Sequence, residues 1–307
     1  MVRPRTAANL SFLFKDQPFL SRFGAAAACG FRHVEFMFAG DGAYLHDAKA
    51  VKKELDEHGL NQVLLNAPAG DWANGDRGLA GVVGRDADFQ ETLKRGVDFA
   101  AEIGCPRVHV MAGTIAGGAD EDTLVQRLKW ASGVAADAKI TLLVEPLNPI
   151  DFPGCTRAIV PVRVFVASDG VSFLRIGTDL VPDASTALRV LDGVDKPNCK
   201  VQLDFYHLAM AGGGLVADAS RKADAPVDAA KLEASVRQLL PRAAHVQLAN
   251  PPSRNEPGVG TVDFVPLLEL LDERGYDGYV GCEYKPSGGD TTEASIASVA
   301  WARGHFG

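Results

Sequence analysis

Cysteine is scarce in this chain of 307 residues, and its placement argues against a disulfide framework. The five cysteines are odd in number and scattered, and no two form a C-x-x-C pair of the kind that holds structural zinc. Cys29, Cys105 and Cys282 adjoin glycine or proline at expected element ends, where a small apolar side chain packs well. Cys282 also adjoins Glu283, but a nucleophilic cysteine requires a neighbouring base, and the sequence offers no specific one. We therefore expect packing roles for the cysteines.

Positive charge is limited as well. Lysine and arginine number 31 against 39 aspartates and glutamates, which gives a formal net charge of -8 and no basic stripe. No apolar run approaches the roughly 20 residues that cross a bilayer, and no small-residue cleavage pattern follows the opening MVRPRTAANLSFLF. We expect a cytoplasmic protein without nucleic-acid or membrane partners, and the sequence leaves open whether it forms a homo-oligomer.

A glycine-rich phosphate turn is missing after the first strand candidate. Lys15-Asp16-Gln17-Pro18 follows that strand where a dinucleotide-binding fold would have G-x-G-x-x-G. The later glycine run AGGGLVADASRKADAPVD has no Lys-Ser/Thr pair at P-loop spacing. A doubly wound nucleotide-binding fold is therefore a poor interpretation.

Apolar sequence is abundant, at 47% of residues, and its pattern predicts the fold. Short strand-like runs alternate with longer amphipathic runs from end to end, which is typical of β/α units and a parallel sheet. The strand candidates are Asn9 to Phe14, His33 to Phe38, Gln62 to Asn66, Arg107 to Met111, Ile140 to Glu145, Lys200 to Asp204, Ala243 to Leu248 and Gly278 to Glu283. The helix candidates include Phe19 to Cys29, Asp47 to His58, Ala87 to Ile103, Asp120 to Ala138, Leu232 to Leu240 and Phe264 to Arg274. Eight units predict a single closed (β/α)₈ TIM barrel, with one domain over residues 1–307.

Two connections are too long for simple βα loops. They are residues 151–183, after the fifth strand, and residues 211–228, after the sixth. The first contains VPVRVFVAS and VSFLRI, which could pair as a hairpin lid, and the second is typical of a flexible loop. We expect both insertions on the carboxyl-end face of the barrel, where they could shape the pocket or reach a partner subunit.

Oxygen-bearing side chains stand at the ends of four strand candidates. They lie in Val144-Glu145-Pro146, Leu203-Asp204-Phe205, His245-Val246-Gln247 and Cys282-Glu283-Tyr284. Because the carboxyl ends of barrel strands converge, these segments form a candidate divalent-metal site. A lone carboxylate at a strand end is often a helix cap or half of an ion pair. Pro146 makes capping a poor explanation for Glu145, but spacing alone leaves open whether His245 or Gln247 belongs to the site.

The residues resemble the hydroxypyruvate isomerase family within the xylose-isomerase-like barrels. The resemblance covers nearly the whole chain except the two insertions, and it rests on the segments NLSFLF, PFLSRFGAAAACGFRHVEF, GLNQVLLNAPAGDWANGDRGLAG, CPRVHVMAGT, LVEPLNPID, LDFYH, HVQLANPPSRNEPGVGTVDF and GYDGYVGCEYKP. It implies a metal held by Glu145, Asp204, Gln247 and Glu283, with Glu145 and Glu283 also carrying the proton. It implies no nucleotide cofactor. Related sugar epimerases carry histidine in place of Gln247.

The chemistry of such a reaction agrees with that ligand set. Moving a carbonyl along a carbon chain removes a proton from the neighbouring carbon and passes through an enediolate whose charge must be stabilised. A hard divalent cation can bind the carbonyl and hydroxyl oxygens together. Three carboxylates and one amide oxygen suit Mg²⁺ or Mn²⁺ better than Zn²⁺.

Five further residues are candidate substrate-binding or supporting groups. Arg254 could bind a substrate carboxylate, or it could be an exposed loop arginine. Lys285 is a second anion-binding candidate with an equally plausible surface role, and Glu256 could support Arg254 or a metal ligand. His207 could orient a ligand or only form a hydrogen bond across the barrel rim. Trp72 could cover the pocket as an apolar lid.

We therefore expect a metal-dependent isomerase of a small sugar acid or keto acid, with hydroxypyruvate converted to tartronate semialdehyde. The nearest alternatives, a 2-oxo-tetronate isomerase or a ketose 3-epimerase, keep the mechanism and change the substrate. An endonuclease of the same superfamily would need more histidine ligands and a basic surface. A non-catalytic sugar-acid-binding protein would not need the complete ligand set.

Overall fold

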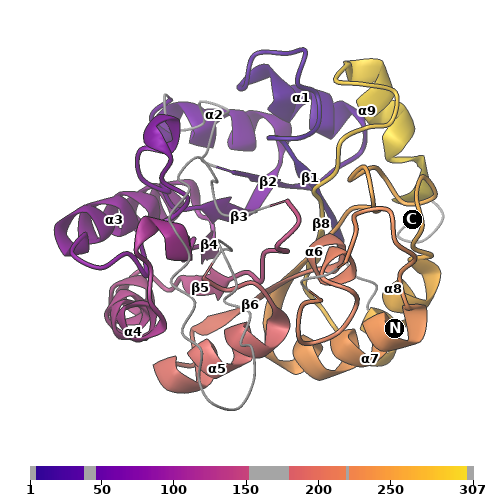
Figure 1. Ribbon diagram of the computed structural model, residues 1–307. Helices are drawn as coiled ribbons and strands as arrows, with labels where there is room; N and C mark the ends of the chain where they lie inside the picture. Colours follow the sequence, from indigo (N-terminus) through magenta and orange to yellow (C-terminus); the bar gives the residue numbers. More distant parts are fainter. Residues whose placement is uncertain (1–4, 38–45, 152–179, 219–220, 303–307) are drawn as a thin grey trace.

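The strands of the chain form a closed barrel. The computed structural model describes residues 5–37, 46–151, 180–218 and 221–302. Its eight strands are all parallel and follow one another in sequence order around the ring, with β1 paired to β8 (Figure 1). The strands are β1 Arg5–Asn9, β2 His33–Phe36, β3 Asn61–Asn66, β4 Arg107–His109, β5 Thr141–Val144, β6 Cys199–Asp204, β7 Ala243–Leu248 and β8 Tyr279–Cys282. The predicted (β/α)₈ barrel is confirmed, whereas the single domain over residues 1–307 stays a prediction.

Helices surround the strands and connect them (Figure 1). The α-helices are α1 Ser21–Ala28, α2 Ala48–His58, α3 Asp86–Ile103, α4 Glu121–Asp137, α5 Ala184–Val194, α6 Phe205–Met210, α7 Ala229–Leu239, α8 Val265–Glu273 and α9 Thr292–Ser298. Short 3₁₀ turns occur at η2 Trp72–Asn74, η3 Ile115–Gly117 and η4 Leu240–Arg242. No described helix has the length and apolar character needed to cross a membrane.

The helix ends follow the sequence signals. The side chains of Asp47 and Asp120 accept backbone N–H groups at the starts of α2 and α4. Gly59 and Gly104 adopt left-handed conformations directly after α2 and α3, with φ of 63° and 75°. Between such ends, α2 buries Ala48, Val51 and Leu55 on one face, as the helical repeat requires. Each helix can therefore stop promptly and return the chain to the next strand.

The predicted position of the first strand was wrong. The sequence predicts a strand from Asn9 to Phe14, but β1 lies before this apolar run and ends at Asn9. The Asn9 side chain accepts a hydrogen bond from the Ser11 backbone N–H at 3.0 Å, and Phe14 adopts a left-handed φ of 60°. The run is therefore a buried turn at the mouth of the barrel, because its apolar side chains pack there without strand pairing.

The two insertions meet the barrel near the start of α5. Most of the first, residues 152–179 with the expected hairpin lid, lies outside the described residues. The second is packed against α5 where it is described: Ala217 donates its backbone N–H to Asp183 Oδ2 at 3.1 Å, and Leu215 accepts from the Ser185 N–H at 2.8 Å. Much of this loop is therefore held by α5 rather than being a free linker.

Asp183 is the group that joins this loop to the helix. It is buried, and its carboxylate accepts the Thr186 and Ala217 backbone N–H groups. Replacing Asp183 by Ala should lower the free energy of unfolding by about 2 kcal/mol, because a cap is lost and a buried N–H is left unpaired. Urea denaturation will measure this loss. The control is Asp228→Ala, which removes the exposed cap of α7 and should cost under about 1 kcal/mol. Equal losses in both variants would contradict the bridging role.

Candidate active site at the carboxyl ends of the strands

Four buried side chains meet at the carboxyl ends of the strands. Glu145, Asp204, His207 and Glu283 each offer one ligand atom, and these atoms all lie within 4.8 Å of one another. Glu145 directly follows β5, Asp204 ends β6, and Glu283 directly follows β8. The structure thus brings together three of the four side chains that the resemblance implied as ligands, and it adds His207.

The carboxylates of this cluster are only partly satisfied by the protein. Asp204 caps the short helix α6, because its Oδ1 accepts the Tyr206 backbone N–H at 2.6 Å. Its Oδ2 and the Oε1 of Glu145 are buried and accept no hydrogen bond. A buried acceptor without a partner is costly, and a divalent cation with oxygen ligands would satisfy both atoms at once. The donor set therefore fits a hard divalent cation.

The protonation of the cluster is strongly perturbed. Burial raises the pKa of Glu145, and the Glu283 and Asp204 carboxylates raise it further. Burial also raises the pKa of Asp204, against the opposing effect of Arg254. The pKa of Glu283 is raised to about 8, chiefly by burial. Positive charge must accompany three carboxylates at this depth if all are to be ionised.

Arg254 supplies part of that charge from the loop after β7. Its Nη2 donates to Glu283 Oε2 at 2.6 Å and lies 3.9 Å from Asp204 Oδ2. The guanidinium carbon lies 5.0 Å from the ring centre of Phe12 and 4.9 Å from that of Tyr206. Only 14% of its side chain is exposed. The alternative of an exposed loop arginine is therefore wrong.

Two histidines adjoin the carboxylates. The Nδ1 of His207 accepts the Asn148 backbone N–H at 3.2 Å, and its Nε2 lies 3.9 Å from Asp204 Oδ2. His109 places its Nε2 3.7 Å from Glu145 Oε2. Burial lowers the pKa of both, to about 3 for His109, and for His207 the nearby Arg254 also contributes. Both rings are neutral at pH 7, so neither adds charge to the site.

Gln247 lies in a hydrogen-bonded network inside the barrel. Its Oε1 accepts from Gln202 Nε2 at 2.6 Å, and its Nε2 donates to Glu35 Oε1 at 2.7 Å. Glu35 also accepts from Asn9 and pairs with His245, and all five side chains are at most 1% exposed. Metal binding by Gln247 stays a prediction. Sequence reasoning missed Glu35, although a glutamate within the apolar strand HVEF was a signal of a buried charge.

The remaining predicted residues lie around the rim. Lys285 is exposed, and its backbone N–H donates to the Arg254 carbonyl at 2.7 Å. Glu256 accepts from both the backbone N–H and the hydroxyl of Ser287, so it braces the loop after β8 rather than contacting Arg254. Trp72 is half-buried in the loop after β3, with the Arg77 guanidinium 3.9 Å above its ring.

An apolar cluster lies on the side of the barrel mouth opposite Arg254. Trp72 packs there on Ala69, Met111 and Leu147, which come from the loops after β3, β4 and β5. Leu147 is two residues beyond Glu145. One side of the mouth is thus cationic and the other is apolar.

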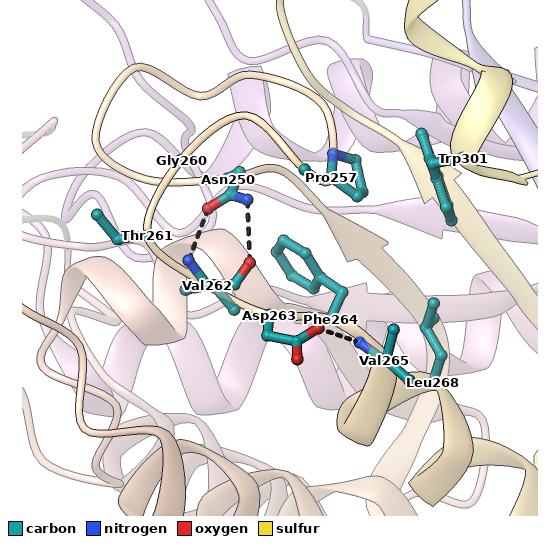
Figure 2. Close-up of a pocket in the computed structure, with 11 residues that line it drawn as sticks. Asn250, Pro257, Gly260, Thr261, Val262, Asp263, Phe264, Val265, Leu268 and Trp301 are labelled. Carbon is teal, nitrogen blue, oxygen red and sulfur yellow. Dashed lines mark hydrogen bonds between the residues drawn. The ribbon is translucent and has the colours of Figure 1, made fainter.

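A separate pocket lies between the loop after β7 and the C-terminal region. It has a volume of about 510 Å³ and includes Phe264, Leu268 and Trp301 in its lining (Figure 2). Its Asn250 side chain is used within the loop, because it donates to the Val262 carbonyl and accepts from the Val262 N–H. None of the four clustered side chains lines this pocket, so it is distinct from the carboxylate site.

A parallel β/α barrel with buried carboxylates at the carboxyl ends of its strands defines the class of this protein. Within that class, residues 23–305 match the family model of the xylose isomerase-like TIM barrel, and the chain belongs to this family. The resemblance seen in the sequence is confirmed.

Characterised relatives match nearly the full length of the chain. A 2-oxo-tetronate isomerase from Cupriavidus necator is 37% identical over 99% of both chains. A hydroxypyruvate isomerase from Escherichia coli K12 is 35% identical over 95% of this chain and 96% of the relative. These relatives confirm the prediction of an isomerase.

Solved structures agree on the fold. One described as an AP endonuclease of family 2 from Brucella melitensis has a TM-score of 0.78 and 32% identity, covering 98% of this chain and 99% of that one. A D-allulose 3-epimerase from Methylomonas sp., in complex with D-allulose, has a TM-score of 0.66 at 17% identity, covering 100% and 99%, which supports the fold alone.

The raised pKa of Glu283 predicts how stability depends on pH when metal is removed. The folded protein keeps a proton on this group up to about pH 8, whereas the unfolded chain loses it near the ordinary value of 4.5. The free energy of unfolding should therefore fall as pH rises from 6.5 to 8, by at most about 1.4 kcal/mol per pH unit for one proton. The window starts at 6.5 because the buried His109 and His207 have the opposite effect below that pH.

Urea denaturation with a chelator present, repeated from pH 6.5 to 9, will measure this dependence. Glu283→Gln removes one titrating group at constant size and should make the slope shallower, while the raised pKa of Glu145 keeps part of the dependence. If the wild-type protein and this variant had equal slopes, the raised pKa of Glu283 would be refuted.

Proposed function

We propose that this protein is a divalent-metal-dependent isomerase of short 2-oxo acids that carry a hydroxyl group next to the carbonyl. The observation that carries the proposal is the buried cluster of Glu145, Asp204 and Glu283 with Arg254 beside it. Such a cluster would bind a cation, and the arginine would bind an anionic substrate beside it. The names of the relatives from Cupriavidus necator and Escherichia coli support the same reaction class.

Glu145, Asp204, Gln247 and Glu283 are the proposed metal ligands. The unpartnered oxygens of Glu145 and Asp204 support the first two, and the raised pKa of Glu283 indicates a carboxylate that needs a cation to ionise. Gln247 would contribute its amide oxygen, for which Gln202 is the present donor. Oxygen ligands of this kind favour Mg²⁺ or Mn²⁺. When bound, the cation would act as a Lewis acid toward the carbonyl and hydroxyl oxygens.

Glu145 and Glu283 are the proposed proton-transfer groups. In hydroxypyruvate, one carboxylate would take the proton from C3 and the other would deliver a proton to C2, through an enediolate, while the hydroxyl proton on O3 is transferred to O2, so that C3 becomes the aldehyde and C2 the alcohol. The two residues stand at the ends of β5 and β8 and so come from different sides of the barrel mouth.

Arg254 is the proposed binding group for the substrate carboxylate. The guanidinium packs near the rings of Phe12 and Tyr206, and it is largely buried beside the carboxylate cluster. The planar pair of donors of an arginine matches the two oxygens of a carboxylate. A ketose has no carboxylate to place there, which argues against the epimerase alternative.

The apolar side of the mouth favours hydroxypyruvate as the substrate. Hydroxypyruvate and 2-oxo-tetronate undergo the same proton transfer and differ only at C3, which carries hydrogen in the first and a hydroxymethyl group in the second. With the carboxylate at Arg254, we propose that C3 would lie on the side of the mouth that carries the cluster of Trp72, Met111 and Leu147. These side chains offer little to bind a further hydroxyl group. The 2-oxo-tetronate reaction remains the second candidate.

Nuclease activity is the alternative raised by the Brucella melitensis structure. The cluster has one histidine among three carboxylates, whereas a zinc centre favours nitrogen ligands. The formal net charge of -8 also disfavours a polyanionic substrate. Incubation with abasic-site DNA therefore serves as the negative control in the assays below.

Replacing either proton-transfer residue should abolish turnover. Glu145→Gln and Glu283→Gln should each lower kcat for hydroxypyruvate by about 100- to 10,000-fold, because an amide cannot exchange the proton. Formation of tartronate semialdehyde with saturating Mn²⁺ will measure the rate. Glu256→Gln is the matched control: it changes a buried carboxylate bound to Ser287 outside the cluster and should leave kcat within about threefold. Full activity of Glu283→Gln would disprove its proton-transfer role.

Replacing Arg254 by Lys should affect substrate binding more than chemistry. The charge is kept, but the planar pair of donors is lost, so we expect KM for hydroxypyruvate to rise about 10- to 100-fold. Lys285→Ala removes an exposed cation nearby and should change KM by less than about threefold. Steady-state kinetics on both variants test this prediction, and a larger effect in Lys285→Ala would transfer the anion-binding role to that residue.

A further inference from the structure

We propose that Glu35 is a positioning residue for the metal site: its carboxylate fixes the Gln247 amide so that the amide oxygen is available as a ligand. This inference rests on the metal site proposed above, but its argument concerns the network of buried side chains below that site. Glu35 lies in β2 and is completely buried, and neither of the proposed catalytic roles uses it.

The orientation of the network begins at a backbone group. The Ser11 backbone N–H is a fixed donor, and it bonds to Asn9 Oδ1 at 3.0 Å. The Asn9 side chain must therefore turn its Nδ2 the other way, where it donates to Glu35 Oε1 at 3.0 Å. This first amide is oriented by the main chain, so its direction does not depend on the rest of the network.

Glu35 passes that orientation on to Gln247. The Oε1 of Glu35 accepts from Asn9 Nδ2 and also from Gln247 at 2.7 Å, so the side of the Gln247 amide that faces Glu35 is its Nε2 group. The Oε1 of Gln247 then points away from Glu35, where it accepts from Gln202 Nε2 at 2.6 Å. An apolar side chain in place of Glu35 would remove this acceptor and leave Gln247 free to flip.

The network ends in β6 at Gln202, which lies two residues before the proposed ligand Asp204. The side chains thus cross the barrel interior from β1 through β2 and β7 to β6. Glu35 contacts three of the other members, because His245 Nε2 lies 2.6 Å from its Oε2.

A glycine in β8 leaves the space that the Glu35 carboxylate occupies. Gly281 in β8 faces Glu35, and a Cβ at position 281 would overlap both Glu35 oxygens. Gly281 is also the register partner of Gln247 in the neighbouring strand. A side chain at this point would displace Glu35 from Gln247. The glycine and the buried glutamate are therefore parts of one arrangement.

The test measures Mn²⁺ affinity by electron paramagnetic resonance of the free ion, using the full-length metal-free protein. Glu35→Leu keeps the approximate size of the side chain but removes the acceptor, and it should raise the Kd for Mn²⁺ about 10- to 100-fold, the range typical of partners of metal ligands. In a Gln247→Leu background, Glu35→Leu should change Kd by less than about twofold, because Glu35 acts through Gln247. Gln62→Leu removes a buried amide of β3 outside the network and should leave Kd unchanged.

Two results would overturn the proposal. They are an unchanged Kd in Glu35→Leu, or an equal effect of that change in both backgrounds, which would mean that Glu35 acts through its charge alone. If Glu35→Leu fails to fold by circular dichroism, Glu35→Asp replaces it: the carboxylate is kept but is too short to reach Gln247, so a raised Kd supports the proposal and an unchanged Kd refutes it.

The readout separates this inference from the proposed function. Wild-type protein that binds Mn²⁺ with the predicted coupling but does not isomerise keto acids would refute the substrate and keep the role of Glu35. Metal-dependent turnover without the coupling would refute the role of Glu35 alone. Wild-type protein that binds no Mn²⁺ would refute both.

Discussion

The crowding of carboxylates in a buried space is the constraint on which the rest of the site depends. Glu145, Asp204 and Glu283 approach one another at the barrel mouth, where little water is available to separate their charges. Burial raises the pKa of all three, which means that ionising them costs free energy in the folded protein. Arg254 offsets part of this cost, and a bound divalent cation would offset the remainder. Three carboxylates that destabilise the folded protein when no cation is present are well suited to binding a metal ion.

The barrel makes this crowding achievable because its strands place side chains from distant parts of the chain at one point. Glu145 and Glu283 are separated by most of the C-terminal half of the sequence, yet they stand at the ends of strands in the same ring. Below them, amides and the Glu35–His245 pair fill the interior that many barrels fill with branched apolar residues. The hydrogen bonds among Asn9, Glu35, Gln247 and Gln202 restrict the orientation of these side chains. This interior can therefore hold the ligands above it in fixed positions.

Much of the fold was predictable from the sequence, because alternating strand-like and amphipathic runs and the glycine helix ends are local signals. Gly59 and Gly104 have the positive φ expected of them. The first strand was misplaced because the apolar turn after Asn9 has the composition of a strand, and only its hydrogen bond to Ser11 distinguishes it. Local sequence patterns show whether apolar residues recur at the spacing of a helix or of a strand. They do not show which apolar run pairs with a neighbouring strand.

The candidate site was predictable only in part. Glu145, Asp204 and Glu283 could be found because each ends a strand, but Glu35 lies mid-strand and its partners come from two other strands, β1 and β7. Arg254 lies in a turn where its own backbone is left-handed, with φ of 61°, and no sequence motif predicts this conformation. Contacts across the barrel depend on the closure of the ring and on strand register, and neither is encoded in any single segment.

Anomalous diffraction from crystals of the protein soaked with Mn²⁺ tests the proposed metal site most directly. We expect one peak within about 2.3 Å of oxygens from Glu145, Asp204, Gln247 and Glu283. A peak at another position, or no peak at the cluster in crystals of an active enzyme, would contradict the claim that these carboxylates exist to hold a metal.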